Sequence, residues 1–254
     1  MIIRVRLFAA QRQAAGRGRL EVEVPPGARV ADAWDAVAAR VPGLDAGRPY
    51  VRYARNGSYV GADEPLEEGD EVAFIPPVAG GADEAVDDTG PPAGPVVRWI
   101  LLTGDPIDDS ALGRLRAAVA TTADGAIVSF EGRTRETPGT PSPGQEEEAA
   151  RHRGGHVLAL DYEAYEGMVE AVLIRIAEEI EERFGVRRVG ILHRTGTVPL
   201  GEASVAIAVA APHRSAAFGA CRYAIDELKA RAPIWKAERF ADGSVWVADP
   251  PAPL

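Results

Sequence analysis

The sequence is poor in cysteine, lysine and histidine. A single cysteine among 254 residues excludes a disulfide framework and any metal site built from several thiolates. The four histidines are scattered without the spacing of metal ligands, so we expect no metal. Only two of the 28 basic residues are lysines, Lys229 and Lys236. Because arginine is not usefully deprotonated, a lysine that persists under this bias is a candidate for chemistry that needs an amine.

Long apolar runs are absent as well. No run approaches the ~20 residues that a membrane-spanning helix needs. Arginines interrupt the apolar N-terminus MIIRVRLF, unlike the apolar segment of a secretory signal. A net charge of −10 argues against nucleic acid as a partner. We therefore expect a soluble, cytoplasmic protein that binds neither nucleic acid nor membranes.

An acidic, proline-rich stretch divides the chain. Residues 82–96 (ADEAVDDTGPPAGPV) hold four acidic residues, three prolines and no basic residue, and they have too few apolar side chains for a core. We predict a first domain over 1–81, a linker over 82–96 and a second domain over 97–254. Within the second domain, the polar stretch 136–156 indicates a long mobile loop.

Apolar periodicity predicts an α+β protein. Alternation of apolar and charged residues indicates strands, and apolar residues spaced by three or four indicate helices. The first domain is predicted to contain a strand, a strand, a helix and further strands, at about 3–7, 20–24, 30–41 and 71–75, with a hairpin turn at Asn56-Gly57. The second domain is predicted to alternate strands with helices at about 109–120, 166–184 and 213–230.

The first domain ends in Gly80-Gly81, shortly after a strand. Glycine is costly to order, so the pair is either a flexible join to the linker or a carrier tail thin enough to enter another active site. Position alone leaves both open. The whole segment LEEGDEVAFIPPVAGG resembles the end of the molybdopterin synthase small subunit. The resemblance implies a β-grasp, ubiquitin-like fold and a terminal glycine that an activating enzyme adenylates and converts to a thiocarboxylate.

One departure from that family concerns Gly81. In the family the second glycine ends the chain, whereas here 173 residues follow it. An internal glycine carbonyl is an amide and cannot be adenylated as a free carboxylate. The sequence therefore predicts either cleavage after Gly81 or a first domain that does not carry sulfur in the usual way.

Three segments of the second domain collect cationic side chains. FEGRTR holds Arg133 and Arg135 two residues apart, which on a strand puts them on one side. APHRS holds His213 and Arg214 at a predicted helix start, where free N–H groups favour an anion. LKARAPIWK holds both lysines, and Pro233 is expected to end the helix between them.

Each residue also has a simpler interpretation. The helix dipole favours the positive charge of Lys229 near a helix C-terminus, and this lysine could also pair with Asp226 one turn earlier. Arg133 could be an exposed strand residue. Cys221 lies on an apolar helical stripe and is interpreted as a core thiol. His193 is interpreted as a structural residue at a strand end.

Taken in order, the three segments resemble the molybdopterin synthase large subunit over about 97–249. The resemblance implies an α/β hammerhead fold, a homodimer through this domain and a cyclic pyranopterin monophosphate substrate that receives two sulfurs, without a cofactor. The site residues it implies are catalytic Lys229, Lys236 and, once the chain is cleaved, Gly81, with substrate-binding Arg135, His213 and Arg214.

The main hypothesis is therefore a fused molybdopterin synthase. One alternative is a sulfur-carrier and docking protein whose second domain is not catalytic. Another is a carrier that serves a different thiolation pathway. A scaffold has no need for the five implied basic side chains of the second domain, which favours the enzyme.

Overall fold

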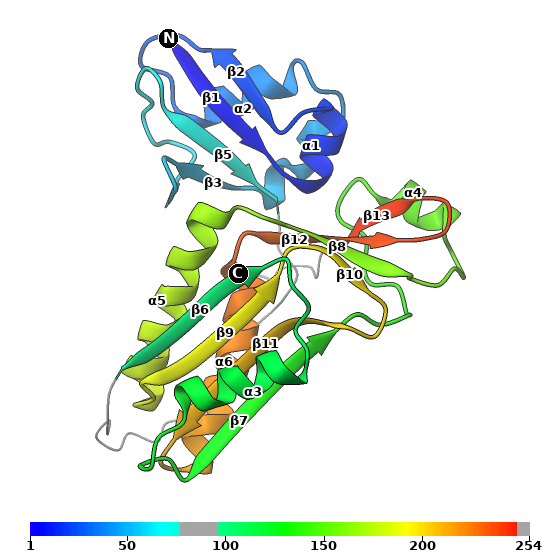
Figure 1. Ribbon diagram of the computed structural model, residues 1–254. Coiled ribbons are helices and arrows are strands. Elements are labelled where there is room, and N and C mark those ends of the chain that lie inside the picture. The colour runs from blue at the N-terminus through cyan, green and yellow to red at the C-terminus, as the bar shows by residue number, and fades with distance from the viewer. Residues whose placement is uncertain (77–95, 248–254) are drawn as a thin grey trace.

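The computed structural model describes residues 1–76 and 96–247, and Figure 1 shows them as two lobes, one above the other. The smaller lobe contains the N-terminus, and the larger lobe contains the two longest helices. Gly80-Gly81 and residues 82–95 of the predicted linker lie outside the described residues. In the described part of the chain, no helix is both long and apolar enough to cross a membrane.

The first lobe is a five-stranded sheet with two α-helices. Its elements are β1 (Ile2–Leu7), α1 (Ala9–Ala15), β2 (Arg19–Glu23), α2 (Val30–Ala38), a 3₁₀ helix (Leu44–Tyr50), β3 (Arg52–Arg55), β4 (Ser58–Val60) and β5 (Glu71–Ile75). The strand order is β2-β1-β5-β3-β4, with β1 and β5 parallel. Trp34 of α2 is fully buried and packs against Phe74 of β5, with ring centroids 4.9 Å apart. The predicted β-grasp fold is confirmed.

The hairpin between β3 and β4 turns at Asn56-Gly57, as predicted. Both residues have positive φ, 49° and 83°, which is the backbone of the tight turn that matches strand twist. The prediction missed α1. Its sequence AAQRQAA carries almost no apolar periodicity, and only Phe8 separates it from β1.

The second lobe contains two four-stranded sheets. Its elements are β6 (Val97–Thr103), α3 (Asp109–Val119), β7 (Ala126–Arg133), α4 (Glu146–Arg151), β8 (Ala159–Ala164), α5 (Glu166–Phe184), β9 (Arg188–Arg194), β10 (Gly196–Pro199), β11 (Ala203–Ala211), α6 (Arg214–Arg231), β12 (Ile234–Arg239) and β13 (Ser244–Val247). The strand orders are β6-β9-β11-β7 and β10-β8-β12-β13. Helices α5 and α6 pack together on the first sheet, and α3 also packs on it (Figure 1).

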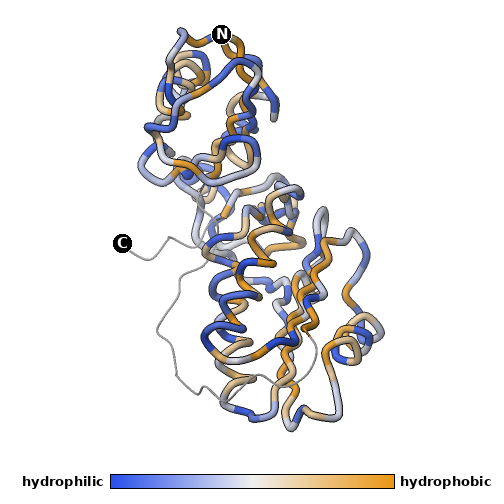
Figure 2. The backbone as a smooth tube through the Cα atoms, turned by 90° about the vertical axis from the view of Figure 1, so that its left-hand side faces the viewer, coloured by the Kyte–Doolittle hydropathy of each residue, from blue (hydrophilic) through white to orange (hydrophobic). Residues whose placement is uncertain are grey.

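The core of the second lobe follows the predicted helical stripe of α5. Val169, Leu173, Ile176 and Ile180 are fully buried and pack with residues of β11 and α6. Burying one such side chain contributes about 1.5–3 kcal/mol. Figure 2 shows orange segments alternating with blue along the helices and strands of this lobe, as expected where one face of each element is buried.

The stretch 136–156 is not simply a loop, contrary to the prediction. Six of its residues form α4, whose first turn holds three glutamates that favour a helix N-terminus. The stretch is also fastened to the second sheet. Gly139 N donates to Glu238 Oε1 at 2.8 Å, and Ser142 N donates to the carbonyl oxygen of Trp246 at 2.8 Å. Local polarity predicted a loop because these tertiary bonds leave no periodic signal in the sequence.

The two lobes meet through a small apolar cluster. Its members are Phe8, Ala9, Ala54, Ala73 and Ile75 of the first lobe and Tyr165, Met168, Trp235, Ala237 and Trp246 of the second. Phe8 stacks on Trp235 with ring centroids 4.5 Å apart, and an ion pair joins Arg12 to Glu163 at 2.8 Å. The first lobe therefore docks on β8, β12, β13 and the start of α5.

Candidate active site

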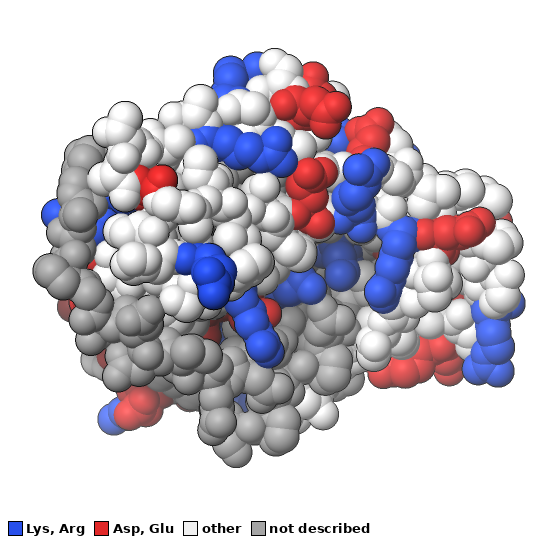
Figure 3. Space-filling view, turned by 90° about the horizontal axis from the view of Figure 1, so that it is seen from below, with Lys and Arg blue, Asp and Glu red and all other residues white. Residues whose placement is uncertain are grey.

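A basic pocket of about 270 Å³ opens in the second lobe, between the end of β7, the β8–β12 pair and the C-terminal half of α6. Its charged lining residues are Arg133, Arg135, Lys229, Lys236 and Glu238. Figure 3 shows Lys and Arg side chains gathered around a hollow on one face of the molecule. A pocket lined by more cations than carboxylates attracts an anionic ligand.

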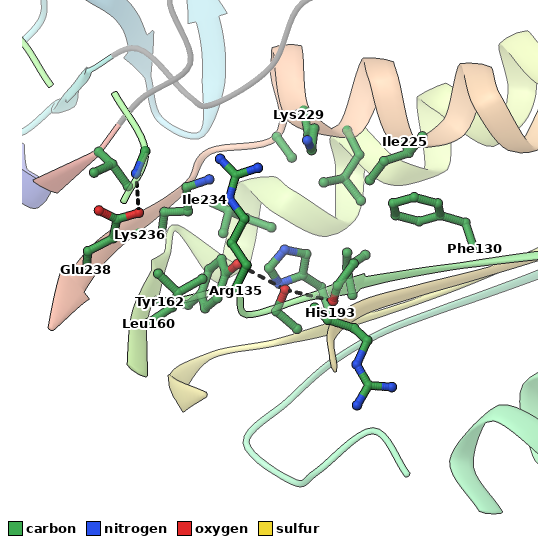
Figure 4. A pocket seen from close by; sticks show the side chains of 18 of the residues that line it. Phe130, Arg135, Leu160, Tyr162, His193, Ile225, Lys229, Ile234, Lys236 and Glu238 are labelled. Carbon is green, nitrogen blue, oxygen red and sulfur yellow. Dashed lines mark hydrogen bonds between the residues drawn. The ribbon is translucent and has the colours of Figure 1, made fainter. Parts of the chain in front are cut away.

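The fold brings three predicted site residues together in this pocket. Arg135 follows the end of β7, Lys229 lies in the last turn of α6, and Lys236 is the third residue of β12. Figure 4 shows their three cationic groups reaching toward the same space. The helix ends at Arg231, just before Pro233 as predicted, so a turn brings the two lysines to one cavity.

Lys229 has no ion-pair partner within the described residues. The partner considered for it, Asp226, instead binds Arg222 one helical turn away at 3.4 Å. Arg133 is 62% exposed and donates to the carbonyl oxygen of Gly201 at 2.9 Å through its Nε, so it lies at the rim. The amine of Lys229 is thus available to a ligand in the pocket.

His193 forms part of the pocket floor and was interpreted from the sequence as structural. Its side chain is buried on β9, and its Nδ1 lies 2.8 Å from the carbonyl oxygen of Arg194. A carbonyl only accepts, so Nδ1 carries the proton and Nε2 keeps a lone pair. Burial lowers the pKa of His193 to about 4; the hydrogen bond to Arg194 opposes this shift, and the positive charge of Lys236 adds to it. The pocket therefore contains a neutral acceptor among its cations.

Glu238 is the second group that sequence reasoning missed. It is buried, lies two residues after Lys236 on β12 and accepts the bond from Gly139 N. Burial raises the pKa of its carboxyl, and the charges of Lys236 and Arg135 oppose this shift. Its spacing of two from Lys236 on a strand was the available signal, because such residues share a face.

The remaining predicted site residues lie elsewhere. His213 occupies the N-cap position of α6 without a side-chain capping bond, and Arg214 is the first residue of the helix. Lys229 is fifteen residues further along, which at 1.5 Å per residue is about 22 Å. Neither residue lines this pocket in one chain. Gly81 lies outside the described residues.

Cys221 takes no part in the site. It is buried in the core between α6 and the sheet, as predicted. Burial raises the pKa of its thiol to about 11, so it stays protonated and is a poor nucleophile at neutral pH.

The fold and the pocket define a carrier-like β-grasp domain docked on an enzyme domain in one chain. Two family models match: the MoaE protein over residues 102–231 and the ThiS family over residues 5–81. The chain therefore belongs to the MoaE family, the catalytic subunits of molybdopterin synthase, and carries a ThiS-family domain ahead of it. The function of this family lies in molybdenum cofactor biosynthesis, and the prediction that the chain is an enzyme is confirmed.

Curated relatives agree with this assignment. The molybdopterin synthase catalytic subunit of Oryza sativa subsp. indica is 43% identical over 143 residues, covering 54% of this chain and 67% of the relative. Catalytic subunit 1 of Aedes aegypti is 39% identical over 148 residues, covering 58% and 84%. The crystal structure of molybdopterin synthase from Staphylococcus aureus is 33% identical, with a TM-score of 0.49, covering 58% of this chain and 95% of that one.

Proposed function

We propose that the chain inserts sulfur into cyclic pyranopterin monophosphate to form the dithiolene of molybdopterin. The sulfur comes from a thiocarboxylate on Gly81, which becomes a chain end when the peptide bond after it is cleaved. The observation that carries this proposal is the position of Pro76. Its carbonyl oxygen accepts a 3.1 Å hydrogen bond from Trp235 Nε1, and Trp235 precedes Lys236. Five residues lead from Pro76 to Gly81, an extended reach of at most ~18 Å.

The pocket residues divide the work by their chemistry. Arg135 binds the substrate phosphate, since a guanidinium suits two-point contact with an anion. Lys229 acts on the acyl group of the carrier tail, and Lys236 orients the substrate and moves protons. The arrangement of all three around one cavity supports these roles.

The transfer has two bond-making steps. The thiocarboxylate sulfur displaces an oxygen from a ring carbon of the substrate: the C–S bond forms, the C–O bond of that carbon breaks, and the departing oxygen takes a proton from Lys236. The product of this step is a thioester between the substrate and Gly81. Water then cleaves the bond between the sulfur and the acyl carbon, leaving the sulfur on the pterin and a carboxylate on Gly81. Two sulfurs need two such visits, and an activating enzyme recharges the tail between them.

His213 and Arg214 enter this proposal through a homodimer of the second domain. They lie about 22 Å along α6 from Lys229, so a second copy of the chain is what brings such a pair to the pocket. With cleaved chains, the assembly would contain two carrier domains and two catalytic domains.

Intact-mass analysis of protein from its native host tests the proposal. We expect two fragments, the smaller ending at Gly81, with a fraction carrying sulfur in place of one terminal oxygen. An uncleaved species that still supports molybdopterin formation contradicts cleavage. Cleaved fragments that pass their sulfur to another acceptor, but never to the pterin, support the alternative thiolation pathway.

A further inference from the structure

The last turn of α6 receives hydrogen bonds from the first lobe. The final carbonyls of a helix have no donors within the helix itself. In α6, Ala232 N bonds to the carbonyl oxygen of Leu228 at 2.9 Å and ends the intrahelical series. Two later carbonyls accept hydrogen bonds from side chains of the first lobe. Tyr59 Oη donates to the carbonyl of Arg231 at 2.9 Å, and Arg52 Nη1 donates to that of Ala230 at 3.4 Å.

Both donors lie on the β3–β4 hairpin and are suited to this place. Burial raises the pKa of the Tyr59 phenol, although the charges of Arg52 and Arg231 oppose the shift, so the hydroxyl remains a donor at neutral pH. The positive charge of Arg52 also favours the negative end of the helix dipole. The hairpin thus supplies one neutral donor and one cation to the end of α6.

The connection to Lys236 is held without the first lobe. Ile234 N bonds to the carbonyl oxygen of Ala232 at 2.7 Å, and Tyr165 N bonds to that of Pro233 at 3.0 Å. These bonds lie within the second lobe and fix the start of β12. Phe8 of the first lobe packs against Trp235 on β12, but the hydrogen bonds of Tyr59 and Arg52 go to the turn that carries Lys229.

We propose that Tyr59, assisted by Arg52, is a positioning residue for Lys229. Docking of the first lobe caps α6 and fixes the turn that presents the Lys229 amine, so the pocket is completed only when a carrier domain is docked. The functional consequence rests on the proposed role of Lys229 in sulfur transfer.

Tyr59→Phe in the full chain tests the inference, because it removes one hydroxyl and keeps the ring. Tyr50→Phe is the matched control, since Tyr50 is 49% exposed in the same lobe and its side chain makes no hydrogen bond within residues 1–76 and 96–247. Amide hydrogen exchange and NMR of [13Cε]lysine are measured on both. The chain has only two lysines, so their signals are readily distinguished.

In Tyr59→Phe we expect the amide of Ala232 to exchange roughly five- to tenfold faster. The Lys229 signal should move, the Lys236 signal and the amides of α5 should stay, and the control should change nothing. Single-turnover sulfur transfer should slow in parallel. Arg52→Gln should give a weaker form of the same pattern.

Two results overturn the inference. One is unchanged exchange and an unchanged Lys229 signal in Tyr59→Phe. The other is an equal change of both lysines and of α5, which marks a general loss of stability. Neither readout needs sulfur chemistry. If the amides and Lys229 respond but no variant transfers sulfur, the proposed function fails and the coupling stands.

Discussion

Trp235 Nε1 donates a 3.1 Å hydrogen bond to the carbonyl oxygen of Pro76, across the boundary between the two lobes. The same indole stacks on Phe8 of the first lobe. The chain therefore leaves the first lobe beside the strand that holds Lys236. Trp235 thus contacts the first lobe and is the neighbour of the pocket residue Lys236 in β12.

Trp235→Phe should weaken this connection while keeping an aromatic ring against Phe8, and it also loses the packing contacts of the larger indole. The variant keeps a stacking ring but loses the N–H, leaving the Pro76 carbonyl without its donor, at a cost of about 1 kcal/mol. We expect a lower urea midpoint and slower sulfur transfer. Trp99→Phe, on β6 in another cluster, is the control. A Trp235→Phe variant with wild-type transfer would show that this bond does not guide the tail.

The two lysines should not tolerate arginine. Lys229→Arg and Lys236→Arg keep the charge but remove an amine that can exchange a proton. Loss of a positioned acid or base typically costs 10²–10⁴-fold, so we expect sulfur transfer to slow by at least about 100-fold in each. Arg222→Lys on the outer face of α6 is the reverse control. Near-normal turnover in both arginine variants would leave the lysines an electrostatic role only.

Mixing two inactive variants tests the homodimer. Arg214→Ala and Lys229→Ala should each abolish most sulfur transfer. If each pocket combines residues of two copies, a mixed dimer has one intact pocket, and an equal mixture should recover about a quarter of the wild-type rate. No recovery after refolding the variants together means that Arg214 does not complete a pocket across a dimer.

Prediction from the sequence was most accurate for features that residues close together in the chain determine. The α5 stripe and the Asn56-Gly57 turn follow from periodicity and from backbone conformation, which neighbouring residues determine. Rarity made the two lysines candidates and the resemblance placed them in one motif; both line the same pocket, and their chemical roles stay predictions. In contrast, His193 and Glu238 have shifted pKa values because they are buried. Their burial depends on which distant strands pair with β9 and β12.

The placement of His213 and Arg214 is a different case. The sequence pattern correctly located their helix start. Helix length alone separates them from Lys229, and one chain cannot fold α6 back on itself. A motif reports which residues act together, and it does not report whether one chain or two supplies them.

His193 should make the protein sensitive to mild acid. Its pKa is lowered in the folded protein to about 4 from 6.5, so below 6.5 the unfolded chain binds a proton that the folded protein refuses. Stability should therefore be highest above pH 6.5 and fall as the pH drops toward 4. Between pH 7 and pH 5 this group alone should cost about 2 kcal/mol of unfolding free energy.

His193→Asn isolates this contribution, because the asparagine amide can still donate to the carbonyl of Arg194. Urea unfolding at pH 7 and pH 5 should show a smaller loss in the variant than in the wild type, by about 2 kcal/mol. His156→Gln is the control, since His156 is 72% exposed, and it should lose as much stability as the wild type. If His193→Asn shows the wild-type dependence on pH, the imidazole already takes up its proton in the folded pocket. The pocket then holds one more cation beside its lysines and arginines in place of a neutral acceptor.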